Sequence, residues 1–141
     1  MAILGFKQNT EDISSLFDKI APRNEYWRRK NYYYHSEIER FYRDIIPENK
    51  NVLEIGSADG YLLDNLKPCY GVGLDISSRM IEISSKKYPK LNFTNAAIDN
   101  YDAKAKFDYV VISNLLEYVF DLYDFFKALN KKISSNTKII I

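Results

Sequence analysis

The chain has 141 residues, of which 46% are hydrophobic, 15% aromatic and 28% charged, so it is long enough for one globular domain and too apolar to be disordered. Its 20 Lys and Arg residues nearly balance its 19 Asp and Glu residues, and a net charge of +1 provides no field that would attract nucleic acid or an anionic membrane. The single cysteine, Cys69, excludes an internal disulfide, and with His35 as the sole histidine a Cys/His metal cluster is excluded as well.

Residues 1–50 are predicted to be helical. Apolar residues recur at intervals of three and four from about Thr10 to Ile46, and Pro22 divides them into two predicted helices. The apolar run from Ala2 to Phe6 is much shorter than the apolar part of a signal peptide, and no run approaches the roughly 20 apolar residues of a membrane span. We therefore expect a cytoplasmic protein without a membrane span.

After Pro47 the pattern changes to short apolar runs that alternate with helical periodicity. Helices are expected at about residues 60–66, 78–87 and 122–133, with Ser77 and Asp121 as the N-caps of the last two. The apolar runs predict buried strands at 51–55, 70–74, 91–93, 107–112 and 138–141. This alternation predicts an α/β fold, a doubly wound and mainly parallel sheet of about five strands with N-terminal helices before it.

The last predicted strand ends in three isoleucines, Ile139 to Ile141, with no helix after them. An uncovered apolar strand at the edge of a sheet tends to pair with another chain. We expect the core, residues 51–141, to be truncated after its fifth strand and followed by a further covalent domain, or else to form a homodimer through this strand.

The strongest site signal is the run from Val52 to Leu63, a strand that enters a turn of small residues and then opens a helix. Gly56 and Gly60 permit positive φ and close approach of a ligand to the backbone, and the new helix offers free N–H groups. Glu54 places a carboxylate beside the same turn. The alternative interpretation is an ordinary tight turn whose glycines serve packing alone.

A second acidic residue, Asp75, is predicted at the end of the second strand. In a doubly wound sheet, a carboxylate at this position accepts hydrogen bonds from the ribose hydroxyls of an adenosine lying across the strand ends. The alternative is that Asp75 caps the following helix, for which Ser77 already suffices.

The spacing of the glycines indicates which adenosine compound is bound. A dinucleotide fingerprint has the order G-x-G-x-x-G, whereas here Ala58 lies between Gly56 and Gly60, so a pyrophosphate fits poorly. The Glu54 carboxylate suits a cationic group such as the ammonium of a methionine moiety. We favour S-adenosylmethionine as the cofactor, with an NAD-dependent or nucleotide-dependent enzyme as an alternative.

From about residue 48 to 141, these motifs resemble the class I S-adenosylmethionine-dependent methyltransferases, which have a Rossmann-like fold. The resemblance implies that the acidic residue and small residues of the first turn hold the methionine part, and that Asp75 holds the ribose. It also places Ile76 against adenine, Ile98 and Asp99 beside the adenine amine, and Asn114 beside the methionine. The implied cofactor-binding set is therefore Glu54, Gly56, Ser57, Ala58, Gly60, Asp75, Ile76, Ile98, Asp99 and Asn114.

The same resemblance implies that residues 1–50 form a helical lead-in that closes over the cofactor. Tyr34, Glu117 and Tyr118 are the candidates for the lid or for contact with the methyl acceptor, with Tyr26 as another closing residue. The basic and aromatic run from Tyr26 to His35 could also bind nucleic acid. We favour a helix with a solvated basic face, because no strong nucleic-acid signal occurs elsewhere.

The resulting functional hypothesis is methyl transfer from S-adenosylmethionine to a small-molecule or saccharide-type acceptor. In-line transfer depends mainly on alignment and exclusion of water, so no catalytic base is assigned. The alternative is a non-catalytic S-adenosylmethionine-binding module, or a fragment of a larger enzyme, because the family sheet normally has seven strands.

Overall fold

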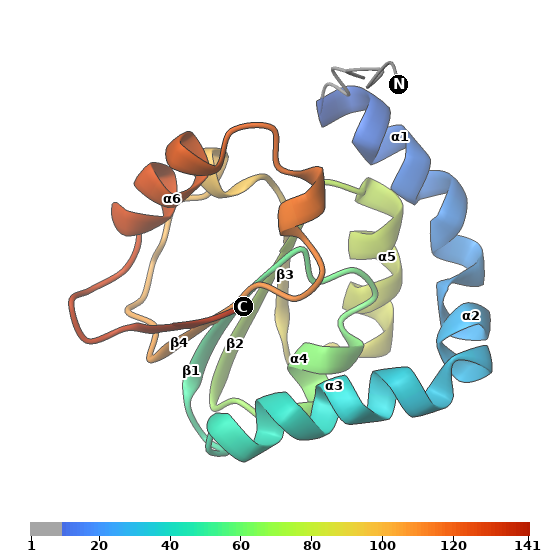
Figure 1. Ribbon diagram of the computed structural model, residues 1–141, viewed down its shortest axis with the longest axis horizontal. Coiled ribbons are helices and arrows are strands. Elements are labelled where there is room, and N and C mark those ends of the chain that lie inside the picture. The colour runs from blue at the N-terminus through green and yellow to red at the C-terminus, as the bar shows by residue number, and fades with distance from the viewer. Residues whose placement is uncertain (1–9) are drawn as a thin grey trace, which may run out of the picture.

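The computed structural model describes residues 10–141 and shows an open sheet with helices on both faces (Figure 1). The predicted apolar run from Ala2 to Phe6 lies outside the described residues. Within them, no helix is both long and apolar enough to cross a membrane.

The N-terminal segment contains one more helix than the sequence predicted. The helices are α1 (Thr10–Ile20), α2 (Asn24–Lys30) and α3 (Tyr32–Ile45), with a 3-10 turn at Ala21–Arg23 between the first two. Pro22 lies at the start of that turn, where its missing N–H has no helical partner to lose. The prediction of one helix after Pro22 is wrong because the backbone leaves the helical region at Asn31, with φ −104° and ψ 36°.

The sheet contains five described strands in the order β3-β2-β1-β4-β5, and every neighbouring pair is parallel. This result confirms the predicted doubly wound α/β fold. The strands are β1 (Asn51–Ile55), β2 (Tyr70–Asp75), β3 (Asn92–Asn95), β4 (Tyr109–Val111) and β5 (Lys138–Ile140).

The crossover helices lie within one residue of their predicted bounds, except that the last one ends at Asn130 and not at residue 133. They are α4 (Tyr61–Asn65), α5 (Ser78–Lys87) and α6 (Leu122–Asn130). The predicted N-caps are confirmed, since Ser77 Oγ accepts a hydrogen bond from the Met80 amide at 3.1 Å and Asp121 Oδ1 accepts one from the Asp124 amide at 2.9 Å.

Each face of the sheet is covered by its own apolar cluster. Leu53 and Val110 belong to a cluster that includes Leu129 of α6, whereas Val52 and Val111 pack with Tyr42 of α3 and with α4. Neighbouring residues of β1 thus enter opposite clusters, as the alternation of side chains along a strand requires. Because β1 pairs with β2 on one side and β4 on the other, the chain order reverses at β1, and the carboxyl ends of these strands border a crevice.

Candidate functional site

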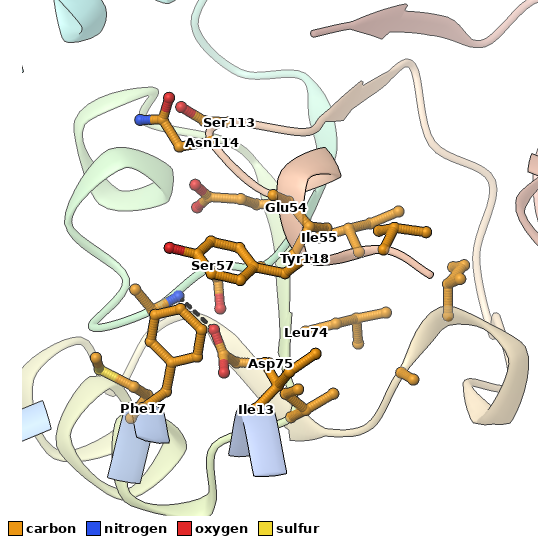
Figure 2. Close-up of a pocket in the computed structure, with 18 of the residues that line it drawn as sticks. Ile13, Phe17, Glu54, Ile55, Ser57, Leu74, Asp75, Ser113, Asn114 and Tyr118 are labelled. Atoms are coloured by element: carbon orange, nitrogen blue, oxygen red, sulfur yellow. Dashed lines mark hydrogen bonds between the residues drawn. The ribbon is translucent and has the colours of Figure 1, made fainter. Parts of the chain in front are cut away.

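A cavity of about 680 Å³ occupies this crevice. Its walls come from the residues that follow β1, β2 and β4, and the N-terminal helices contribute the opposite side (Figure 2). All the predicted site residues line it except Gly60, Tyr34 and Tyr26: those present are Glu54, Gly56, Ser57, Ala58, Asp75, Ile76, Ile98, Asp99, Asn114, Glu117 and Tyr118.

The turn after β1 brings backbone to the cavity wall. Gly56 has φ +76°, and the amides of Gly56 and Ser57 both donate to the Leu74 carbonyl at 2.8 and 2.9 Å. A Cβ on Gly56 would lie 3.0 Å from the Leu115 side chain, so both the backbone angle and the space favour glycine.

Gly60 has a structural role instead of lining the cavity. It has φ +79° at the start of α4, and a Cβ there would lie 2.6 Å from the Phe93 ring. The glycine therefore permits the left-handed start of α4 and its close packing against β3.

Asp75 is held rigidly at the end of β2. Its Oδ2 accepts a hydrogen bond from the Ala58 amide at 2.9 Å, and its Oδ1 accepts one from the Ser77 amide at 2.8 Å. These bonds fix the carboxylate against the first turn, and each oxygen keeps a further lone pair for a ligand. Burial raises the pKa of the Asp75 carboxyl, because the charged form is partly desolvated.

Two buried polar groups in the wall lack partners. Glu54 is 3% exposed and Ser57 is 4% exposed, and neither Glu54 Oε2 nor Ser57 Oγ has a hydrogen-bond partner among the described residues. Burial raises the pKa of the Glu54 carboxyl well above 4.5, and the nearby Asp59 carboxylate adds to the effect. Because buried polar groups are usually paired, both atoms indicate a place where a ligand completes the site.

Helix α1 covers the Asp75 side of the cavity. Ser14 Oγ donates to the Ile76 carbonyl at 2.9 Å, and Asp18 accepts hydrogen bonds from Ser77 Oγ at 2.6 Å and from the Arg79 amide at 3.0 Å. The Phe17 ring meets the Tyr118 ring edge to face at 5.1 Å (Figure 2). The sequence predicted Tyr118 at the site but missed Phe17, whose helical spacing indicated only an apolar face.

Helix α2 is anchored to the first turn by a buried ion pair. Arg28 pairs with Asp59, and their side chains are 12% and 5% exposed. The Arg28 guanidinium also stacks over the Tyr61 ring, 4.2 Å from its centroid. The prediction of a solvated basic face is therefore wrong at Arg28, because its partner lies 31 residues away on the turn.

The Tyr61 ring extends this anchor to α3. Its hydroxyl donates to Glu39 Oε2 at 2.7 Å, and burial together with the Glu39 carboxylate raises the pKa of Tyr61 to about 12. His35 lies nearby on the cavity wall, where burial and the Arg28 charge lower the pKa of its imidazole.

Tyr34 lines a second, more open cavity of about 580 Å³. Its hydroxyl donates to Asn114 Oδ1 at 3.3 Å, and Asn114 has the unusual φ of +53° for a non-glycine residue. The two cavities share five wall residues: Ile38, Ser113, Asn114, Leu115 and Glu117. The Tyr34 contact with Asn114 thus lies where the two cavities adjoin.

Comparison with known sequences identifies one family. The model of the methyltransferase domain family matches residues 26–141. A candidate methyltransferase of Invertebrate iridescent virus 6, named 235L, is 28% identical over 100 residues, which cover 68% of this chain and 38% of the viral protein.

Solved structures share the fold. DhpI in complex with S-adenosylhomocysteine has a TM-score of 0.74 at 18% identity, covering 92% of this chain and 66% of DhpI. A chain of the complex between the Haloferax volcanii Trm112 methyltransferase activator and a methyltransferase has a TM-score of 0.65 at 21% identity, covering 79% of this chain and 53% of that one. The chain therefore spans about half, or less, of the length of the viral and Haloferax volcanii proteins.

Proposed function

Because the chain belongs to the methyltransferase domain family and has the Rossmann-like fold of class I methyltransferases, we propose that it binds S-adenosylmethionine and transfers the methyl group to a small-molecule acceptor. The observation that carries this proposal is that a rigid Asp75 lies around one cavity with Glu54 Oε2 and Ser57 Oγ, two buried atoms without a hydrogen-bond partner among the described residues.

The residues present fit the cofactor. The free lone pairs of Asp75 suit two ribose hydroxyls, and the apolar side chains of Ile76 and Ile98 suit an adenine ring. Glu54 offers an anionic oxygen to the ammonium of the methionine part, and Asn114 lies at the far side of the same cavity. Asp99, which is exposed at the rim, suits the adenine amine as a hydrogen-bond acceptor.

When bound, the cofactor supplies an electrophilic methyl group on a sulfonium. The chain's own residues then have to align the acceptor with that methyl and keep water away. Phe17 and Tyr118 cover the cavity above Asp75, and the ion pair of Arg28 with Asp59 keeps α2 in place beside it. Residues 10–50 thus serve as the lid in this proposal. Phe17 of α1 and Arg28 of α2 line the cavity, whereas Tyr34 and Tyr26 do not.

Calorimetric titration with S-adenosylhomocysteine tests the cofactor site. Asp75→Ala should weaken binding by about 1.5–3 kcal/mol, the range for hydrogen bonds to a charged group. Asp44→Ala removes an exposed carboxylate of α3 that does not line the cavity and serves as the matched control. Unchanged affinity of the Asp75 variant, or displacement of S-adenosylhomocysteine by NAD, would contradict the proposal.

Transfer of an isotope-labelled methyl group distinguishes an enzyme from the second candidate, a non-catalytic cofactor-binding module or fragment. The second candidate follows from the length of the relatives, since the chain spans 38% of the viral protein. Three further statements remain predictions. They are a saccharide-type acceptor, a cytoplasmic location, and a partner at β5, which is either a second copy of the chain or a covalently following domain.

A further inference from the structure

The charges around the main cavity are strongly unequal. One base, Arg28, is among the described lining residues, although the chain as a whole has 20 bases and 19 acids. Eight carboxylates line the same cavity: Glu39, Glu54, Asp59, Asp75, Asp99, Glu117, Asp121 and Asp124. This imbalance indicates the chemical class of the methyl acceptor, and that inference rests on the proposed function.

The one base is already neutralised. Arg28 is paired with Asp59 and stacked on the Tyr61 ring, and the side chains of the ion pair are 12% and 5% exposed. His35 adds no charge near neutral pH, because burial lowers the pKa of its imidazole. The described wall therefore offers no unpaired cation to an acceptor that carries a carboxylate or phosphate.

The second cavity continues the same pattern. Its described charged residues are Glu37, which pairs with Arg40 at 2.6 Å, and Glu117, which is exposed at the junction with the main cavity. Tyr34, Phe41 and Tyr42 also line this cavity, together with the aliphatic residues Ile38, Ile112, Leu115, Leu116 and Ile141. Aromatic faces and carboxylates both attract a cation and repel an anion.

We propose that the methyl acceptor is an amine, protonated when free, which docks in the second cavity with its nitrogen at the junction beside Asn114 and Glu117. The ammonium first loses one proton to water. The freed nitrogen lone pair forms the new N–C bond with the methyl carbon as the S–C bond breaks. The electron pair of that bond remains on sulfur, whose positive charge is thereby removed, and one proton is released for each methyl transferred.

The test supplies isotope-labelled S-adenosylmethionine with three sets of acceptors on the same aryl and alkyl skeletons: amines, alcohols and carboxylic acids. The amine set should receive about tenfold more label than either other set, because we expect the cavity to bind a cationic acceptor about tenfold more tightly than a neutral or anionic one. Glu117→Gln should raise the KM for amines about fivefold and leave kcat and S-adenosylhomocysteine affinity nearly unchanged, since an exposed charge contributes little more than that.

Glu48→Gln is the matched control, because Glu48 is an exposed carboxylate paired with Lys67 and does not line either cavity. Label found chiefly in alcohols or carboxylic acids would overturn the amine assignment alone. Failure to bind S-adenosylhomocysteine, or normal binding with no label in any set, would instead overturn the proposed function.

Discussion

At the residue scale, Glu54 combines burial, which destabilises the ligand-free protein, with the negative charge that the proposed cofactor site requires. Its carboxyl is buried at the end of β1, with one oxygen lacking a partner and two further carboxyls, Asp59 and Asp75, near enough to raise its pKa. A group buried in this way favours its protonated form until a cation enters the cavity. The same atoms that destabilise the ligand-free protein therefore favour a positively charged ligand.

Glu54→Gln should stabilise the ligand-free protein at pH 7.5 and weaken S-adenosylhomocysteine binding by about ten- to a hundredfold, the effect of losing a charged hydrogen bond. The folded-state pKa of Glu54 is raised above 4.5, so its contribution to stability is lost as pH rises from 4.5 through the folded pKa. The stability gap between variant and wild type should therefore narrow towards pH 4.5. Urea unfolding at pH 7.5 and pH 4.5 measures this difference in unfolding free energy. A difference that does not change with pH would contradict the raised pKa of Glu54.

At the scale of elements, the three N-terminal helices are joined to the cavity by contacts between distant parts of the chain. Asp18 of α1 accepts hydrogen bonds from Ser77 and the Arg79 amide at the start of α5, while Arg28 of α2 binds Asp59. These contacts hold α1 and α2 on the side of the cavity opposite the strand ends.

Arg28→Ala should destabilise the fold by about 3–5 kcal/mol, because it leaves the buried Asp59 carboxylate without its partner. It should also speed the release of S-adenosylhomocysteine, measured by stopped-flow fluorescence, since α2 loses its anchor. Arg29→Ala, which removes an exposed pair with Glu25, is the control and should change stability by about 0.5 kcal/mol or less.

A second substitution separates the ion pair from the packing of Arg28. Adding Asp59→Asn to Arg28→Ala removes the unpaired buried charge and should recover part of the lost stability, although release stays fast. Unaltered release in the single variant would show that α2 does not retain the cofactor.

At the scale of the whole molecule, the sheet exposes apolar side chains along its outer edge, at β5. In the described chain β5 pairs with β4 on one side, and Ile139 and Ile141 are 37% and 61% exposed. Free strand edges of this kind pair with other strands.

Light scattering over a concentration series should show the 16.5 kDa chain forming dimers through this edge. Ile139→Lys places a charge on the edge and should keep the chain monomeric without changing S-adenosylhomocysteine binding. A wild-type chain that stays monomeric at every concentration would exclude pairing between copies through β5.

Local patterns in the sequence were sufficient to predict most elements and the residues at the strand ends that line the cavity. Ser77 and Asp121 cap their helices through groups three residues away. Gly56 directly follows β1 and Asp75 ends β2, and the carboxyl ends of these two strands must meet in a parallel sheet. Such features depend on neighbours in the chain and on the order of the strands, both of which are written in the sequence.

Contacts across the fold were decided by the tertiary structure alone. Gly60 appeared to be a ligand-approach glycine, but the Phe93 ring occupies the space beside it. In the sequence Arg28 is part of a basic run on a helix, whereas in the fold it pairs with Asp59. Tyr34 likewise donates a hydrogen bond to Asn114, which lies 80 residues away in the sequence. Local periodicity does not show these contacts, because they form only when segments far apart in the sequence pack together in the folded chain.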